Sequence, residues 1–321
     1  MLFLLCLLAL ALSFVLTPAV IGLAWRIGAV DVPCDGRRMH HQSIPRAGGI
    51  AVYTAFLAVA MVGGDLRRDM ICILCGGGLM LAVGLADDIF CLDAWAKFFF
   101  QIAATTATVI GCGIETRGGT LGAILWVLAL TNAHNFIDGL DGLFSGCAAI
   151  EGVALFLVLS IEGNGTLAVL ALLLALSCLG FRYFNRYPAQ IFAGDCGSAT
   201  VGFLLGVLSL PLFETPLFDA AVLSPFLIFA YPLTDLTTAV FRRVLRGKSP
   251  FLADRGHFHH RLFDAGLLHP QCTGVLTLIG AGFAVVGILV RIEALCVAAA
   301  ISCVALAFLL MRIRRFVEEF H

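Results

Sequence analysis

The sequence predicts an all-α polytopic membrane protein with about 11 transmembrane helices. Of the 321 residues, 60% are hydrophobic and only 13% are charged, whereas roughly a quarter of the residues of a soluble domain are charged. The mean hydropathy is +1.01. A bilayer-spanning helix needs about 20 apolar residues, so a chain of this length holds about 10 or 11 of them once the turns are included.

The apolar runs divide the chain into a series of spans that form a single domain, residues 1–321. The first run has no basic stretch before it and is longer than the core of a signal peptide, so we expect a retained helix. The sequence contains no evident internal repeat, and because transporters often contain repeats, this argues mildly against that class. The predicted spans are residues 2–25, 48–63, 70–86, 97–113, 120–134, 143–161, 166–180, 197–213, 220–240, 273–290 and 294–311.

Basic residues are distributed unevenly between the two sides of this predicted domain. If the N-terminus lies outside, one side receives the loops 26–47, 87–96, 135–142, 181–196 and 241–272 and the tail 312–321, and with Lys97 at its edge it carries 16 of the 20 Lys and Arg residues. The positive-inside rule makes this side, and the C-terminus, cytoplasmic. All eight histidines fall on or beside it. A pump or channel places ionisable groups along a path through the bilayer, so this distribution favours an enzyme whose active site is on the cytoplasmic face.

The net charge argues against a nucleic-acid-binding protein, and the positions of the cysteines argue against a disulfide-bonded one. The net charge of −1 provides no basic field for a nucleic-acid partner. Most of the 12 cysteines lie in apolar runs, where Cys behaves as a small hydrophobic residue, so we expect free thiols. The spacing Cys72-x-x-Cys75 lacks a second pair or a nearby His and is a weak indication of a metal site.

The first motif that predicts chemistry is Gly84-Leu-Ala-Asp87-Asp88, at the cytoplasmic end of the third span, with Lys97 just past the next turn. Adjacent carboxylates repel each other unless a cation or a proton relieves them. Mg²⁺ is commonly held by one or two carboxylates together with substrate phosphates. The motif therefore favours a divalent metal or a base, and the alternative is an ordinary solvated helix end.

The second motif lies between the fifth and sixth spans, at residues 131–143. Asn132, Asn135, Asp138 and Asp141 recur at every third position, so each is a neighbour of the next on a helical surface. Two glycines allow the backbone to turn or to approach a ligand closely. The density of polar groups favours a binding site for a polar ligand or a metal over a simple turn, although Asn, Asp and Gly also dominate turns.

The third motif, Phe192-Ala-Gly194-Asp195-Cys-Gly197-Ser198, opens the eighth span. Small residues at a helix N-terminus let backbone N–H groups meet an anion, and Asp195 could hold a metal that bridges to it. The alternative is helix capping, because Asp and Ser are both favoured N-cap residues.

Two basic segments complete the set. The loop 242–262 carries six basic residues and the pattern His257-x-His259-His260, which suits a polyphosphate because Arg makes forked contacts with phosphate. Zinc is less favoured because the helical HExxH arrangement is missing, and attraction to anionic lipid is the alternative. The segment 31–49 places Arg37, Arg38, His40 and Arg46 before Gly-Gly, a position suited to a lipid phosphate, although the positive-inside rule alone would also explain the arginines.

Together these motifs resemble the polyprenyl-phosphate N-acetylhexosamine-1-phosphate transferase superfamily, glycosyltransferase family 4. The resemblance runs in order from Asp31 to Leu262. The HxHH form is similar to bacterial UDP-GlcNAc:undecaprenyl-phosphate GlcNAc-1-phosphate transferases, whereas the branch that uses UDP-MurNAc-pentapeptide has HHH. Ala253 departs from the Pro usual in that branch and removes no reactive group. The motifs that carry the resemblance are Asp87-Asp88, Asn132-x-x-Asn135-x-x-Asp138-Gly-Leu-Asp141-Gly-Leu, Gly194-Asp195-x-Gly197-Ser198 and Ser249-Pro-Phe…Asp254-Arg255-x-His257-x-His259-His260.

The resemblance implies transfer of a sugar-1-phosphate, GlcNAc-1-phosphate in the first place, from a UDP-sugar to undecaprenyl phosphate with release of UMP. This step would start a surface polysaccharide of the O-antigen, common-antigen or teichoic-acid type, at the cytoplasmic face of the bacterial inner membrane. Phosphoryl transfer demands mainly positioning and charge neutralisation, which agrees with the motifs. A homodimer is a further expectation, because the family is often dimeric.

The resemblance also implies roles for individual residues. Mg²⁺, or alternatively Mn²⁺, would be held mainly by Asp195 with help from Asp88, and Asp87 is the candidate base that deprotonates or orients the lipid phosphate. Asn135, Asp138 and Asp141 would hold the nucleotide, and Phe192 would stack on uracil. The implied catalytic residues are Asp87, Asp88, Asp195, His257, His259 and His260, and the implied substrate-binding residues are Lys97, Asn132, Asn135, Asp138, Asp141, Phe192, Arg255, Arg37, Arg38, His40 and Arg46.

Two alternative functions stay open at the level of sequence. The same reaction with another UDP-HexNAc, such as a 6-deoxy-HexNAc, is compatible with every motif. A transporter for a lipid-linked or anionic solute is a remote alternative, because apart from Glu151 and Asp235 few ionisable residues fall where a path through the membrane would need them.

Overall fold

The computed structural model describes residues 1–32, 43–63, 67–113, 116, 118–214, 220–247 and 258–292. This part of the chain is almost entirely helical, with one short antiparallel sheet in which Val30 pairs with Pro45 and Asp31 with Ile44. The elements are α1 (Leu2–Ile27), β1 (Val30–Asp31), β2 (Ile44–Pro45), α2 (Gly48–Gly63), α3 (Arg68–Phe90), α4 (Ala94–Cys112), α5 (Gly119–Ile137), α6 (Leu143–Ile161), α7 (Gly165–Asn185), α8 (Asp195–Leu208), η1 (Leu210–Glu214), η2 (Ala220–Val222), α9 (Leu223–Ile228), α10 (Ala230–Leu245), α11 (Phe258–Asp264) and α12 (His269–Arg291).

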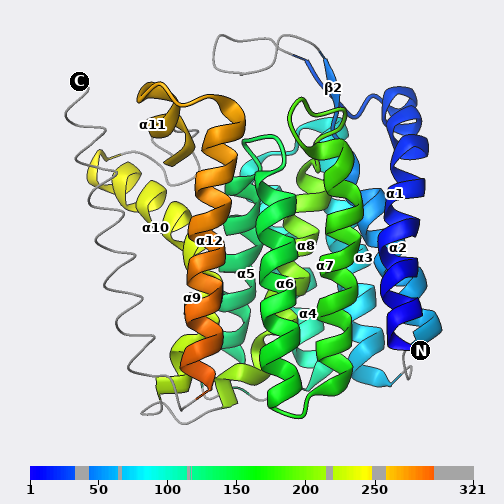
Figure 1. Cartoon of the computed structure of the whole chain (residues 1–321), viewed down its shortest axis with the longest axis vertical. Helices are drawn as coiled ribbons and strands as arrows, with labels where there is room; N and C mark the ends of the chain where they lie inside the picture. Colours follow the sequence, from blue (N-terminus) through cyan, green and yellow to red (C-terminus); the bar gives the residue numbers. More distant parts are fainter. Residues whose placement is uncertain are drawn as a thin grey trace.

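The long helices form a bundle whose axes run roughly side by side, with the N-terminus at the end opposite to β2 and α11 (Figure 1). Among the described residues, seven helical stretches are long and apolar enough to cross a membrane, and α2 is a shorter apolar helix. The protein is therefore an all-α, multi-pass membrane protein. The count of eleven spans and the orientation stay predictions, and the predicted span 294–311 lies outside the described residues.

One predicted span is not a single helix. Residues 220–240 form η2, α9 and α10, with a break at Phe229. Pro232 explains the break, because proline has no N–H to donate to the carbonyl four residues earlier and its ring clashes with that carbonyl. After the break α10 is inclined to the bundle (Figure 1). Its Thr, Asp and Arg residues give it a polar face that an uninterrupted transmembrane span would not carry.

Helix α8 lies at the centre of the bundle, and every residue from Cys196 to Leu208 is buried. Small residues allow its neighbours to approach closely, as is common between membrane helices. A Cβ atom on Gly202 would lie 2.6 Å from the carbonyl oxygen of Leu130 in α5. A Cβ atom on Gly84 of α3 would lie 2.5 Å from Cα of Cys196. Backbone-to-backbone contact therefore fixes α3 and α5 against the start of α8.

Gly84→Ala is expected to destabilise the protein by about 1–3 kcal/mol, the usual cost of overpacking, and to lower activity. The added methyl group would meet backbone atoms of Asp195 and Cys196, which cannot rotate away as a side chain could. Gly22→Ala is the matched control, since nothing lies within 4 Å of its added methyl group. Thermal unfolding in detergent measures both variants. Equal unfolding temperatures for the two would contradict the close contact of α3 with α8.

His134 and Glu151 form a buried pair inside the bundle, with exposed fractions of 0% and 1%. His134, which the sequence analysis assigns to the cytoplasmic face, faces α6 instead: its Nε2 lies 2.7 Å from Oε2 of Glu151, and its Nδ1 lies 2.9 Å from the Leu130 carbonyl oxygen. A carbonyl oxygen only accepts, so Nδ1 is the donor in its contact with Leu130, and Nε2 is the ring nitrogen that meets the Glu151 carboxyl group. The pair therefore joins α5 to α6.

Glu151→Leu is expected to destabilise the protein by about 1–3 kcal/mol, because it leaves the buried Nε2 of His134 without its partner. The double variant His134→Phe with Glu151→Leu replaces both polar groups by apolar ones and should recover most of that loss. Thermal unfolding in detergent compares the wild type, the single variants Glu151→Leu and His134→Phe, and the double variant. A double variant as unstable as the sum of the two single variants would show that the pair is not coupled.

Candidate active site

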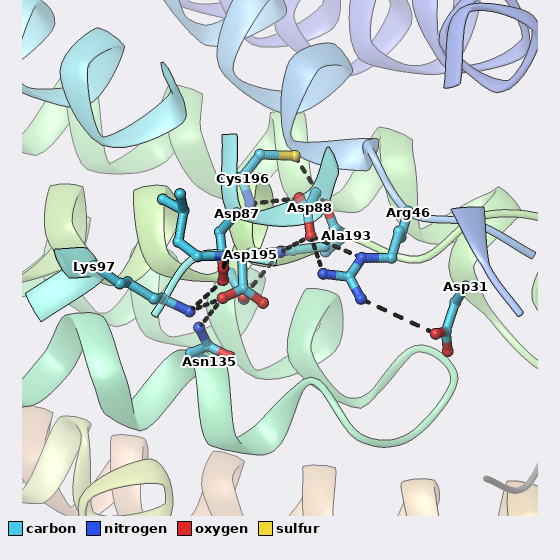
Figure 2. A network of polar contacts seen from close by, with 12 residues as sticks. Asp31, Arg46, Asp87, Asp88, Lys97, Asn135, Ala193, Asp195 and Cys196 are labelled. Atoms are coloured by element: carbon cyan, nitrogen blue, oxygen red, sulfur yellow. Dashed lines mark hydrogen bonds and ion pairs between the residues drawn. The ribbon is translucent and has the colours of Figure 1, made fainter. Parts of the chain in front are cut away.

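The polar residues of three motifs meet at the end of the bundle that carries β2, where α3 and α5 end and α8 begins (Figures 1 and 2). Two groups of contacts make up this site. One is a buried ion pair between Asp88 and Arg46, and the other is a more accessible group in which Lys97 lies between Asp87 and Asp195.

Asp88 is an internal anchor. Its Oδ1 accepts hydrogen bonds from Nε of Arg46 at 2.9 Å and from the backbone N–H of Asp195 at 3.0 Å. A terminal guanidinium nitrogen of Arg46 lies 2.8 Å from the same oxygen. Oδ2 accepts from the backbone N–H of Cys196 at 3.0 Å. The carboxylate thus caps the first turn of α8, where unpaired N–H groups and the helix dipole favour an anion.

Backbone hydrogen bonds on both sides of Arg46 place its side chain next to Asp88. The N–H of Phe192 donates to the carbonyl of Pro45 at 2.8 Å, and the N–H groups of Gly48 and Gly49 donate to the carbonyls of Phe192 and Ala193 at 3.0 Å each. This strand-like pairing holds the start of α2 beside the loop that leads into α8.

Gly194 sits where these segments meet, with a φ of +71° that favours glycine. A Cβ atom at this position would lie 2.6 Å from Oδ2 of Asp88 and 2.6 Å from the carbonyl oxygen of Arg46. Only glycine therefore allows the loop to pass between the two partners of the ion pair.

Asp87, although adjacent to Asp88, points to a different set of partners. Its Oδ1 accepts from the backbone N–H of Leu92 at 2.8 Å, and its Oδ2 accepts from Nζ of Lys97 at 3.0 Å. Nζ of Lys97 also forms an ion pair with Oδ2 of Asp195, and that oxygen accepts from Nδ2 of Asn135 at 3.0 Å. The Lys97 ammonium group, at the start of α4, thus connects the end of α3 to the first residue of α8 (Figure 2).

Accessibility separates the two adjacent carboxylates. The side chain of Asp88 is 0% exposed, whereas those of Asp87 and Asp195 are 13% and 20% exposed. A ligand from outside the bundle can therefore reach the carboxylates of Asp87 and Asp195 but not that of Asp88. Both carboxylate oxygens of Asp88 already accept hydrogen bonds from donors inside the protein.

In the more accessible group, as far as the structure describes it, the carboxylates of Asp87 and Asp195 share one ammonium group, that of Lys97. Asp31 lies 4.0 Å from Arg46, so Arg46 has a second carboxylate near it besides that of Asp88. Burial lowers the pKa of Arg46, but the negative charges of Asp88, Asp31 and Asp87 outweigh it and the net pKa is raised. Arg46 stays charged, and the excess of one carboxylate over the Lys97 ammonium group favours a bound cation.

The donor set fits a cation that also uses substrate oxygens. Within residues 1–292 as described, no three His, Cys, Asp or Glu side chains form a complete metal cage. Mg²⁺ rarely needs one, because it keeps waters and takes one or two carboxylates together with phosphate oxygens. Asp87 and Asp195, which contact the same Lys97 ammonium, provide two carboxylates of this kind.

The remaining residues of the second motif separate into two groups. Asp138 belongs to the site: it is half-buried, it lies close to Gly194, and its pKa is raised by burial and by the negative charge of Asp88. Asn132 lies elsewhere, since its Nδ2 donates to Gln101 at 3.2 Å and to the Leu128 carbonyl at 2.9 Å. Asn132 therefore packs α5 against α4.

Asp141 holds a loop. Its Oδ2 accepts from the backbone N–H of Ala189 at 2.9 Å, and its Oδ1 lies 3.6 Å from Nε2 of His269. Phe192, the predicted stacking residue, is half-buried, and its backbone pairs with Arg46. Several predicted residues lie outside the described part of the chain: Arg37, Arg38, His40, Arg255 and His257. His259 and His260 belong to α11, and their side chains are also outside it.

The sequence did not predict the contacts of several supporting residues. Arg46 was expected to contact lipid phosphate or a loop, whereas it binds Asp88. Arg182, counted only as a cytoplasmic charge, donates to the carbonyl of Gly142 and thereby fixes the loop after Asp141. Asn185 donates to the carbonyl of Ile191 at 3.1 Å and accepts from Ser145 at 2.8 Å. The sequence signal for Arg182 and Asn185 was their position, because both are polar residues at the end of an apolar run.

The chain is similar to known proteins over most of its length. The model of the glycosyl transferase family 4 matches residues 70–212, which include Asp87, Asp88, Lys97, Asn135 and Asp195. A Bacillus subtilis protein named probable undecaprenyl-phosphate N-acetylglucosaminyl 1-phosphate transferase is 33% identical over 294 residues, covering 86% of this chain and 81% of the relative. The chain belongs to glycosyl transferase family 4.

Other relatives carry similar names within this family of polyprenyl-phosphate N-acetylhexosamine-1-phosphate transferases. A decaprenyl-phosphate N-acetylglucosaminephosphotransferase of Mycolicibacterium smegmatis is 36% identical, covering 80% of this chain and 74% of the relative. An undecaprenyl-phosphate alpha-N-acetylglucosaminyl 1-phosphate transferase of Escherichia coli is 29% identical, covering 83% and 77%. The similarity spans most of both chains, so it concerns the whole membrane domain.

Proposed function

We propose that this protein transfers N-acetylhexosamine-1-phosphate, most directly GlcNAc-1-phosphate, from a UDP-sugar to undecaprenyl phosphate and releases UMP. The observation that carries the proposal is the contact of Lys97 with both Asp87 and Asp195 at an accessible end of a membrane bundle. The names of the relatives support the acceptor and the sugar phosphate. The reaction would take place at the cytoplasmic face of a bacterial inner membrane and start a surface polysaccharide.

The reaction exchanges one phosphoanhydride bond for another. An oxygen of the lipid phosphate attacks the β-phosphorus of the UDP-sugar, and a P–O bond forms. The bond from that phosphorus to the bridging oxygen breaks, and the electron pair leaves with UMP. Because such transition states need mainly alignment and charge stabilisation, the chain's task is to hold two anionic substrates in line.

We propose Asp195 and Asp87 as the carboxylates that hold Mg²⁺, or Mn²⁺ in its place. This revises the expectation that Asp88 assists Asp195, because both Asp88 oxygens already accept internal hydrogen bonds. The metal would supply charge neutralisation on the diphosphate. Lys97 would then contact the donor diphosphate, and Asp88 with Arg46 would hold Asp195 in position.

The other residues take roles in binding. Asn135 contacts Asp195, and Asp138 lies close to Gly194, the residue before Asp195. We therefore assign Asn135 and Asp138, together with Phe192, to the binding of the nucleotide. Arg255, His257, His259 and His260 are proposed to contact the diphosphate. Arg37, Arg38 and His40 are proposed to contact the lipid phosphate. A homodimer remains a prediction.

The test is UMP release by the purified protein in detergent with UDP-GlcNAc, Mg²⁺ and undecaprenyl phosphate. Omission of the lipid and addition of a chelator are the controls, and both should abolish release. A parallel reaction with a UDP-linked 6-deoxy-HexNAc decides the sugar. Faster release with the second donor would keep the reaction and change the substrate, whereas no release with any donor would contradict the proposal.

Direct attack by the lipid phosphate predicts that the enzyme stays unmodified when UDP-GlcNAc is present without acceptor. A lipid phosphate is largely ionised at pH 7, so it needs orientation more than a strong base. Asp87, the candidate base from the sequence, contacts the Leu92 N–H and Lys97 and is assigned above to the metal, so direct attack requires no proton transfer to it. Intact-mass measurement after incubation with donor and Mg²⁺ checks this, and a phospho-aspartyl adduct would contradict it.

A further inference from the structure

His269, the first residue of α12, lies among three segments that the proposed reaction uses. Its Nε2 is 3.6 Å from Oδ1 of Asp141. Its ring stacks on Tyr187, with ring centroids 4.7 Å apart and an interplanar angle of 28°. The ring also meets Phe263 of α11 in an edge-to-face arrangement, with ring centroids 5.6 Å apart. A single side chain thus contacts the α5–α6 loop, the α7–α8 loop and α11.

Asp141 connects His269 to the loop that leads into the site. Its other carboxylate oxygen, Oδ2, accepts from the backbone N–H of Ala189 at 2.9 Å. Its carbonyl oxygen accepts from Oγ1 of Thr273, one turn further along α12, at 3.2 Å. The α7–α8 loop that Asp141 holds continues directly into Phe192 and Asp195. The start of α12 therefore fixes the two loops that carry the proposed nucleotide side.

The third contact concerns α11. Phe263 belongs to this short helix, which also contains positions 259 and 260 of the histidine motif. Leu262 of α11 is buried in the same apolar cluster as Cys272 and Leu276 of α12. His269 lies at the point where α11, α12 and the two loops meet, so a change at this ring alters their relative placement.

We infer that His269 is a positioning residue for donor binding, acting through Asp141. The inference rests on the proposed function for the identity of the donor. Within the described part of the chain, the side-chain contacts of His269 are with Asp141, Tyr187 and Phe263 and not with the Lys97 group, so we assign it no direct contact with the reacting atoms. Loss of a contact that holds the binding site equally in ground and transition states raises KM with little change in kcat.

The experiment measures the Kd of UDP-GlcNAc in the presence of Mg²⁺ without acceptor, and the KM and kcat of the full reaction. His269→Phe keeps an aromatic ring next to Tyr187 and Phe263 and removes the polar contact with Asp141. It should weaken UDP-GlcNAc binding about threefold to tenfold, as expected for one lost polar contact, with the KM for undecaprenyl phosphate unchanged. Gln271→Ala is the control, because it removes the α12 capping contact with the N–H of Leu268 and leaves Asp141 untouched.

A double-mutant cycle with Asp141→Asn shows whether His269 acts through Asp141. The double variant should bind UDP-GlcNAc no more weakly than Asp141→Asn alone. Unchanged donor binding in His269→Phe, equal weakening in Gln271→Ala, or additive losses in the double variant would overturn the inference. If the wild-type protein binds UDP-GlcNAc but does not turn over, the proposed function fails and the Kd comparison still decides the inference. If it binds no UDP-sugar, both fail.

Discussion

Asp195→Asn is expected to lower kcat for UMP release by about 100-fold or more, the usual scale for removing one group that stabilises charge at a reacting centre. The substitution keeps the shape of the side chain and removes its negative charge. Oδ2 of Asp195 contacts both Lys97 and Asn135, so the loss falls where the proposed metal and diphosphate meet. The unfolding temperature should stay unchanged, because the backbone N–H of residue 195 still donates to Asp88.

Asp69→Asn is the matched control for this variant. Asp69 pairs with Arg67 near the start of α3, at the other end of the bundle, and its side chain is 34% exposed. The same chemical change there should leave UMP release at the wild-type rate. Activity in Asp195→Asn within tenfold of wild type would contradict the role given to this carboxylate, and a lowered unfolding temperature would show that the charge also supports the fold.

Arg46→Met is expected to lower the free energy of unfolding by about 3 kcal/mol and to abolish most of the activity. It leaves the Asp88 carboxylate buried without its cation, and breaking a buried ion pair from one side typically costs about 3–5 kcal/mol. Because Arg46 itself is 23% exposed, we expect the lower end of that range. The first turn of α8 then loses its fixed position, and with it Asp195.

Two further variants give this prediction its controls. Arg67→Met removes an exposed partner of Asp69 and should change stability by less than about 0.5 kcal/mol. Asp88→Asn combined with Arg46→Met removes the unpaired charge and should be more stable than Arg46→Met alone, while staying inactive. Chemical unfolding in detergent measures the series. A double variant less stable than the single one would contradict the ion-pair account.

Most of the architecture could be predicted from the sequence, because long apolar runs determine membrane helices. The clustering of the motifs also followed, since α3 and α5 end where α8 begins. The break in residues 220–240 was missed because hydropathy outweighed Pro232, whose effect depends on a carbonyl four residues earlier. Hydropathy alone treats such a segment as one continuous span.

The different partners of the adjacent carboxylates of Asp87 and Asp88 could not be predicted from the sequence. Adjacent residues on a helix point about 100° apart, and only the packing of α3 on α8 determines which carboxylate meets the backbone N–H groups. Arg46 is 42 residues from Asp88 in the chain, and the pairing of Pro45 with Phe192 brings them together. The contact of His134 with Glu151 depends in the same way on how α5 and α6 pack.

The most direct test of the central claim follows the fate of the β-phosphate. UDP-GlcNAc with a radiolabelled β-phosphate is incubated with the protein, Mg²⁺ and undecaprenyl phosphate, and the organic and aqueous phases are separated. Transfer of the sugar-1-phosphate predicts that the label enters the lipid phase, in step with the UMP that is released, and that it does not do so with Asp195→Asn. Label that stays in the aqueous phase as UDP while the sugar enters the lipid would show transfer of the sugar alone and contradict the account.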